Sequence, residues 1–393
     1  MKDYRTILTL VCVCLLSMAT GCDIQIGDWG QAKYDRTVQR QAPLPAGSRL
    51  VAKTSLGFVT ITGADVTDCN VVAEICGRAP TEEEALEMAE KVEVTLETVG
   101  DTMTVKADKP TTKSNRSISI SYTITVPKRT RIECASSYGA IKVSGINANV
   151  RGNTSSGSIA AENIEGAVSL DTSYGSVKCR NISGDELSVK SSSGSITAEG
   201  IKGLARLNTS YGSITCRDIS DGDVQLKSSS GSINLTNASF DNCDAHTSYG
   251  SIVADELKGD SIKLHSDSGG IDVTTASADT VGISTSYGRI TGRQITTSNL
   301  TVRSGSGSLD IDCSQATPAG LVASLETSYG SIDFTPPPGF AGQVDLSTSY
   351  GSIRTSRPIT IAGEMSKKQL KGTIGEGSGK LHLQTSSGSI NLK

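Results

Sequence analysis

The stretch that decides the fold is "LDTSYGSVKCRNI", residues 170–182, together with "VKSSSGSITAEGI", residues 189–201. Both contain hydroxyl residues, then a glycine, a serine and a β-branched residue. They differ just before the glycine, where the first has Tyr174 and the second has Ser193. The chain therefore repeats itself closely while alternating a large and a small side chain at one position.

The glycine of this motif recurs along most of the chain, up to Gly307 at steps of 18 or 19 residues and later at steps of 23, 21 and 37. A short fixed period is typical of a stacked repeat protein, and the longer late steps indicate insertions. The glycines are Gly139, Gly157, Gly175, Gly194, Gly212, Gly231, Gly250, Gly269, Gly288, Gly307, Gly330, Gly351 and Gly388.

Apolar residues keep constant offsets from these glycines. The residue two places after each glycine is always a branched aliphatic, and the positions five and seven before and four after are mostly apolar. Polar residues occupy the positions between them. Alternation with a period of two on both sides of each glycine predicts two short strands per repeat with one buried face.

Such short strands bury enough apolar surface only when identical turns stack on one another. Neighbouring turns would lie about 4.8 Å apart, the spacing of hydrogen-bonded strands. The sequence therefore predicts an all-β fold, a single-stranded parallel β-helix or β-solenoid with turns of 18–19 residues over residues 131–393, with one N-terminal capping helix.

The preceding region, residues 45–130, is expected to be a β-rich cap. It contains "TEEEALEMAEKV", where Thr81 and Glu84 form a capping box that predicts a helix over residues 81–92. We expect this helix to cover the open end of the solenoid, because an uncovered row of backbone groups invites aggregation. Residues 22–44 are expected to be a polar tether.

The first residues read as an export signal over residues 1–21. Lys2 and Arg5 precede an apolar run of about a dozen residues, which is too short for a membrane span. The run ends in "MATGC", which resembles a bacterial lipobox and implies lipidation of Cys22. The sequence therefore predicts an exported protein, anchored by lipid to the cell envelope on its periplasmic or cell-surface side.

The residue before each turn glycine alternates between tyrosine and serine up to Ser306, and Tyr329 and Tyr350 then break the pattern. From the parity of the strands we expect these tyrosines to point inward, with the small serines giving each ring room between turns. The alternative is an exposed aromatic row that binds a sugar or polymer. The tyrosines are Tyr138, Tyr174, Tyr211, Tyr249, Tyr287, Tyr329 and Tyr350.

The motifs "TSYGSI" and "SSSGSI", the strand ending "ITVPK" and the tail "LKGTIGEGSGKLHLQTSSGSINL" resemble the bacterial "putative adhesin" β-solenoid domain, whose function is otherwise unknown. The resemblance covers about residues 45–393. It implies the same fold and an envelope location, and it carries little about activity.

The residues favour binding over catalysis. We expect no enzyme activity, cofactor or metal site, and the net charge of −4 gives nucleic acid no electrostatic support. The expected partners are the membrane, through the lipid, and a surface polymer or protein. The alternative is a polysaccharide-binding or polysaccharide-processing β-helix that uses an outer face. Cys179 and Cys216 should lie two turns apart, too far for a disulfide.

Overall fold

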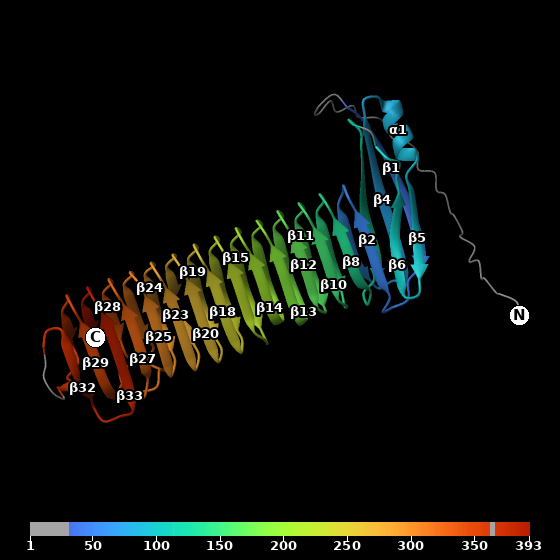
Figure 1. Ribbon diagram of the computed structural model, residues 1–393. Coiled ribbons are helices and arrows are strands. Elements are labelled where there is room, and N and C mark those ends of the chain that lie inside the picture. Colours follow the sequence, from blue (N-terminus) through green and yellow to red (C-terminus); the bar gives the residue numbers. More distant parts are fainter. Residues whose placement is uncertain (1–30, 113, 362–365) are drawn as a thin grey trace, which may run out of the picture.

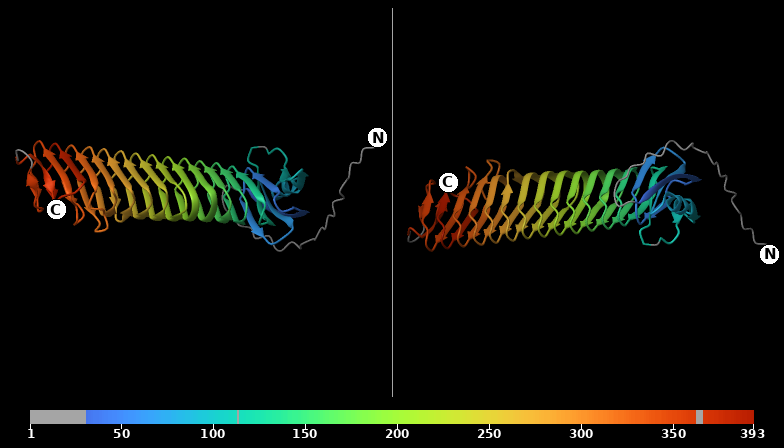
Figure 2. Two further views of the ribbon diagram at one scale, coloured as in Figure 1. Left: turned by 90° about the horizontal axis from the view of Figure 1, so that it is seen from below. Right: turned by 90° about the horizontal axis from the view of Figure 1, so that it is seen from above.

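The computed structural model describes residues 31–112, 114–361 and 366–393, and they form a straight rod of stacked coils with a wider N-terminal end (Figures 1 and 2). The rod has about 11 turns of about 19 residues each, which confirms the predicted β-solenoid. Each regular turn contributes two strands, one before and one after the turn glycine, and each strand pairs in parallel with its counterparts in the neighbouring turns.

The strands before the glycines form one sheet of the rod. They are β8 (Arg131–Ser136), β10 (Val150–Thr154), β12 (Val168–Thr172), the second half of β13 (Val177–Ser191), the second half of β14 (Ile196–Thr209), β16 (Val224–Ser228), β18 (Asn242–Thr247), β20 (Ser261–Ser266), β23 (Thr280–Thr285), β25 (Asn299–Ser304) and β27 (Val322–Thr327).

The strands after the glycines form the other sheet. They are β9 (Ile141–Ile146), β11 (Ile159–Glu165), the first halves of β13 and β14, β15 (Ile214–Ser220), β17 (Ile233–Ser239), β19 (Ile252–Lys258), β21 (Ile271–Val273), β22 (Ala276–Ser277), β24 (Ile290–Thr296), β26 (Leu309–Cys313) and β28 (Ile332–Thr335).

The core is the stack of apolar columns that the offsets predict. Ile196, Ile214 and Ile233 are register partners in consecutive turns, and each is fully buried. The prediction that Cys179 and Cys216 lie two turns apart is confirmed, because Cys179 pairs with Ala198 and Ala198 pairs with Cys216. The seven cysteines of the described ranges are all free.

A buried hydroxyl three residues before each turn glycine closes the turn. Thr209 Oγ1 donates to the Gly194 carbonyl of the preceding turn (3.0 Å) and accepts from the Gly212 N–H of its own turn (3.2 Å). The same column is Ser or Thr in every repeat and is buried throughout: Ser136, Thr154, Thr172, Ser191, Thr209, Ser228, Thr247, Ser266, Thr285, Ser304, Thr327, Thr348 and Thr385.

Thr209→Val keeps the shape of this side chain and removes its hydroxyl. We expect a loss of about 1–3 kcal/mol in the free energy of unfolding, because two buried backbone groups lose their partner. Ser210→Ala, at the next and half-exposed position, is the control and should change little. Chemical denaturation of both variants measures the difference. Equal stabilities would show that this column of buried hydroxyls does not stabilise the fold.

A second corner lies six residues after most of the turn glycines. Asn163 and Asn181 stand there with φ of 55° and 50°, a left-handed conformation that asparagine tolerates better than most residues. The Asn181 side chain donates to Asn163 Oδ1 at 2.9 Å, and this hydrogen bond links the corners of two neighbouring turns.

The N-terminal end is closed mainly by antiparallel strands. β2 (Arg49–Thr54) and β3 (Val59–Ala64) form a turn that stacks on β8 and β9, and β6 (Thr102–Asp108) and β7 (Ser117–Pro127) stack on its other side. β5 (Glu93–Val99) then pairs antiparallel with β6, and β4 (Asp68–Ala79) pairs antiparallel with β7. Within the described residues, the parallel stack at this end is therefore followed by antiparallel strands.

The helix and the tether both differ from expectation. α1 spans Glu82–Glu90, shorter than the predicted 81–92, with Thr81 as its N-cap. It packs on β4 and β1, so it backs the capping strands rather than covering the solenoid end by itself (Figure 1).

The tether prediction is wrong for its second half. Residues Ala32–Pro43 form β1, which pairs antiparallel with the whole of β4. Alternate β1 residues face the cap, with Val38 buried, and twelve backbone pairs hold a sequence that looks polar. The predicted signal segment, Cys22 and the first part of the tether lie outside the described residues. In the ranges described, no helix has the length and apolar character of a membrane span.

The C-terminal turns do not stack in sequence order. After β28 the chain places β29 (Gly342–Thr348) and β30 (Ile353–Thr355) one rung further out, and β33 (Gly379–Thr385) and β34 (Ile390–Leu392) return to fill the rung between. β32 (Gln369–Ile374) pairs antiparallel with β29 at the outer edge, and β31 (Thr360–Ile361) pairs with β32.

Candidate functional site

The tyrosines that precede the turn glycines point outward, so the prediction that they pack inside the solenoid is wrong. Their exposed fractions run from 68% at Tyr138 to 81% at Tyr350, and the five between them are at 71% or 72%. We call these seven residues the tyrosine row: Tyr138, Tyr174, Tyr211, Tyr249, Tyr287, Tyr329 and Tyr350.

The column of buried hydroxyls explains why the tyrosines point outward. Strict alternation would carry Tyr174 inward because Leu170 and Thr172 point inward. However, Thr172 Oγ1 accepts from Gly175 N–H at 3.1 Å, which closes a tight bend over the two residues between them. Those two residues bulge to the outside, and alternation resumes only after the glycine.

Backbone hydrogen bonds between turns hold the bend in place. The Tyr174 N–H donates to the Ser155 carbonyl at 3.1 Å, and the Ser193 N–H of the next turn donates to the Ser173 carbonyl at 2.8 Å. Equivalent bonds recur at Tyr211 and Tyr249. The row is therefore borne by an ordered, hydrogen-bonded edge.

In the sequence, the alternation of tyrosine and serine is interrupted at Tyr329 and Tyr350, but in the folded rod it continues. The Ser387 N–H donates to the Ser328 carbonyl (2.9 Å), and the Tyr350 N–H donates to the Ser386 carbonyl (2.9 Å). The turn of Ser387 therefore lies between the turns of the two tyrosines. Tyrosine and serine alternate along the whole edge from Tyr138 to Tyr350, with rings repeating every second turn, about 9.6 Å.

Tyr211→Ser should barely change stability. A side chain that is 71% exposed has little burial to lose, and surface substitutions usually stay within about 0.5 kcal/mol. Tyr122→Ser, at a tyrosine that is 1% exposed, is the matched control and should cost about 3 kcal/mol or more. Urea denaturation of the two variants checks the contrast. A large loss of unfolding free energy for Tyr211→Ser would show that its ring is buried after all.

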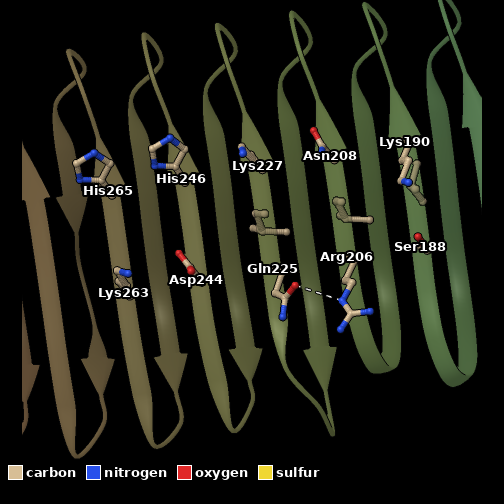
Figure 3. A pocket seen from close by; sticks show the side chains of 13 residues that line it. Ser188, Lys190, Arg206, Asn208, Gln225, Lys227, Asp244, His246, Lys263 and His265 are labelled. Atoms are coloured by element: carbon tan, nitrogen blue, oxygen red, sulfur yellow. Dashed lines mark hydrogen bonds between the residues drawn. The ribbon is translucent and has the colours of Figure 1, made fainter.

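A basic groove lies on the sheet that leads into these turns. Its outward side chains come from β13, β14, β16, β18 and β20 and form two parallel lines across the strands (Figure 3). The line nearer the tyrosine edge is Lys190, Asn208, Lys227, His246 and His265, and the other is Ser188, Arg206, Gln225, Asp244 and Lys263. The groove thus holds four cationic side chains and one carboxylate.

The cations of the groove differ in their partners. Arg206 donates to Glu186 (2.9 Å) and to Gln225 Oε1 (3.2 Å). Lys190, Lys227 and Lys263 are exposed and, within the described residues, form no ion pair. Their charge is therefore available to a ligand.

The two histidines of the groove are stacked. The ring centroids of His246 and His265 are 4.9 Å apart and the rings are within 6° of parallel. His265 also contacts Asp267 Oδ1 (3.0 Å) and Ser284 Oγ (2.8 Å). The pKa of His246 is lowered mainly by partial burial and, to a smaller extent, by the neighbouring His265. The lowered pKa favours the neutral form of His246, so this ring adds flat polar surface rather than charge.

Carboxylates cluster on the other sheet, where Arg293 donates to Asp310 (2.6 Å) and Asp312 (3.0 Å). The hydrogen bond from Arg293 lowers the pKa of Asp310, which keeps it ionised rather than able to donate a proton. Among the residues described, no group of three or more His, Cys, Asp or Glu is arranged to hold a metal ion.

Comparison with known families agrees with this architecture. The Toastrack DUF4097 family matches residues 59–259 and 214–393, which together run from β3 to the end of the chain. The chain belongs to this family. The resemblance that the turn motifs indicated is therefore confirmed.

Two solved structures are similar to this Toastrack chain in the extent of the match but not in sequence. One is described as a "putative cell adhesion protein" from Clostridium sporogenes, with 10% identity and a TM-score of 0.18, covering 91% of this chain and 99% of its own. The other is described as a "putative adhesin" from Bacteroides fragilis, with 11% identity and a TM-score of 0.21, covering 91% and 97%. Scores this low add nothing about function. No curated protein matches the chain.

The sequence pattern predicted the residues of the tyrosine row but not their surroundings. Along one column of the first sheet, Asp171, Lys190, Asn208 and Lys227 alternate in type, so no cluster of one charge is visible when the column is read turn by turn. A comparison of every second turn, instead of every turn, would have revealed the order in that column.

Proposed function

We propose that this protein is a lipid-anchored, non-catalytic binding protein of the bacterial cell envelope, an adhesin or scaffold that holds an extended surface polymer along its tyrosine row. The observation that carries the proposal is the unbroken two-turn repeat of exposed tyrosines, kept through the out-of-order C-terminal turns. Tyrosine combines a broad apolar ring with a polar hydroxyl and is enriched at binding hot spots.

A regular row suits a repetitive ligand. Each ring offers a small contact, but a polymer that engages several rings gains avidity, since later contacts form at high effective concentration. The rigid spacing lowers the ordering cost of binding, because the turns are already held by backbone hydrogen bonds. A polysaccharide-processing role has no comparable support, because the clustered Asp310 and Asp312 are committed to Arg293.

Co-sedimentation with insoluble envelope polysaccharide tests the proposal. Wild type should sediment with the polymer, and Tyr211→Ser/Tyr249→Ser/Tyr287→Ser should remain largely in the supernatant. The control is the serine-site variant Ser213→Ala/Ser232→Ala/Ser251→Ala, which changes the residue just after each turn glycine. Equal sedimentation of wild type and the tyrosine variant would refute the row as the binding surface.

The anchor is a separate part of the proposal. Cys22 precedes the capped end of the rod, so a lipid there would hold that end at the membrane and direct the array outward for roughly 50 Å, the length of about 11 turns. The row would then be presented to polymers above the membrane surface.

Cys22→Ala should leave the chain unlipidated and extractable from envelopes without detergent, because the acyl chains would be missing. Phase partitioning in a cloud-point detergent measures the change, and Cys76→Ala, at a thiol outside the signal, is the control. A mutant that still enters the detergent phase would rule out this anchor.

A further inference from the structure

Cations on the first sheet alternate, turn by turn, with the tyrosines of the adjacent edge. The column four residues before each turn glycine is in register across the sheet, and it runs Asp171, Lys190, Asn208, Lys227, His246, His265, Ser284, Arg303, Glu326. Lys190, Lys227 and Arg303 all belong to turns whose bend carries serine, and His265 does too. None of the lysine or arginine residues of this column belongs to a tyrosine turn.

The column and the tyrosine row therefore share one two-turn repeat. Lys190 lies on the turn between Tyr174 and Tyr211, and Lys227 on the turn between Tyr211 and Tyr249. Each lysine is three residues before the serine of its own turn, on the sheet that leads into the bend. Over these turns one aromatic ring and one lysine recur per roughly 9.6 Å. Further along the column, His265 takes the next serine turn and Arg303, which is paired with Glu326, takes the one after it.

We propose that the polymer held by this surface is a linear acidic polysaccharide with one carboxylate per disaccharide. This inference rests on the proposed function and names its ligand. Sugar rings would lie on alternate tyrosines, and successive carboxylates would meet Lys190 and Lys227. A disaccharide of a β-linked glycan has a length comparable to two turns, so ring and charge would stay in phase.

Charge complementarity supports an anionic partner at this place. Apart from Arg206, which is paired with Glu186, the groove has three lysines against the single carboxylate of Asp244, on a chain whose net charge is −4. Asn208 and Gln225 lie between the cations and can hydrogen-bond sugar hydroxyls (Figure 3). The lysines are exposed and have no ion-pair partner in the described structure, so a carboxylate displaces no internal salt bridge from them.

The probe for the test is a set of hyaluronan oligosaccharides, which carry one carboxylate per disaccharide. Their match is the same set with each carboxyl group reduced to an alcohol. Fluorescence anisotropy with the full exported chain should show binding of the acidic form at least about tenfold tighter, the factor expected when one charge-assisted hydrogen bond is lost.

The variant Lys190→Gln/Lys227→Gln should remove that preference, with unchanged melting temperature, since both side chains are exposed. The matched control is Lys142→Gln/Lys178→Gln, which removes two exposed lysines from the strands after the glycine and should keep the preference.

Three results would overturn the inference. Equal binding of acidic and reduced oligosaccharides that is lost in Tyr211→Ser/Tyr249→Ser would leave the proposed function standing and remove the acidic ligand. Equal affinity for single-stranded DNA of the same charge would replace the glycan with general polyanion binding. Binding of neither oligosaccharide would also reject the acidic glycan, whereas the envelope co-sedimentation, which uses no chosen glycan, judges the proposed function independently.

Discussion

Ile214→Asp should cost several kcal/mol of stability and leave most of the protein unfolded or expanded at room temperature. Ile214 is fully buried between Ile196 and Ile233. A carboxylate there has no partner, and burying it is costly unless it becomes protonated or the turns open to water. Because each turn is stabilised by its two neighbours, the damage should spread beyond one coil.

Thr215→Asp is the matched control. Thr215 is the next residue on β15 and points outward, and Asp272 already occupies the same column three turns further along. Circular dichroism during thermal unfolding should show a large decrease in melting temperature for Ile214→Asp and a small change for Thr215→Asp. Similar decreases in both would mean that the inner and outer faces are assigned wrongly.

Gly231→Ala should be the second most damaging change. A Cβ at this position would lie 1.9 Å from the Gly212 carbonyl oxygen of the preceding turn, far inside van der Waals contact. Because the obstacle is backbone, the two turns must separate, and we expect a loss of about 3 kcal/mol or more in unfolding free energy.

Gly282→Ala tests whether the effect belongs to the corner. Its nearest atom would be the Ile262 carbonyl oxygen at 3.9 Å, an ordinary contact, so this variant should be close to wild type. Chemical denaturation of the pair gives the comparison. A corner variant as stable as Gly282→Ala would contradict the close approach of successive turns.

The part of the fold that could be predicted is the part set by periodic burial. The offsets of Ile196, Leu207 and Ile214 from their glycines gave the strands, the buried face and the stacking register, because a strand with one buried face leaves a period of two in the sequence. The turn glycines were also found, and the structure supplies their reason, which is close packing against a carbonyl of the neighbouring turn.

The bends could not be predicted by the same rule. A hydroxyl such as that of Thr172 looks like any other polar residue in the sequence, but buried and bonded to two backbone groups it ends the alternation two residues early. That one hydrogen-bond pattern turns Tyr174 from a core residue into a surface residue. The left-handed corner at Asn163 is likewise a backbone feature that periodicity does not contain.

The out-of-order C-terminal turns were missed because sequence offsets do not tell in which order turns stack. The step of 37 residues between Gly351 and Gly388 reads as an insertion, whereas the strand pairing and the hydrogen bonds of Ser386 and Ser387 place the last turn between the two turns that precede it in the sequence. β1 was missed because only Val38 on it is buried, which leaves little apolar signal.

The central claim is that the tyrosine row alternates with serine along the whole edge, and disulfide trapping at its C-terminal end tests it most directly. Tyr329→Cys/Ser387→Cys places two exposed thiols on neighbouring turns, about 4.8 Å apart and within the range of a disulfide, whereas Tyr329→Cys/Tyr350→Cys places them about 9.6 Å apart. Mild oxidation should cross-link the first pair efficiently and leave the second pair reduced. Efficient cross-linking of 329 with 350, without that of 329 with 387, would show that the turns stack in sequence order and that the row is broken.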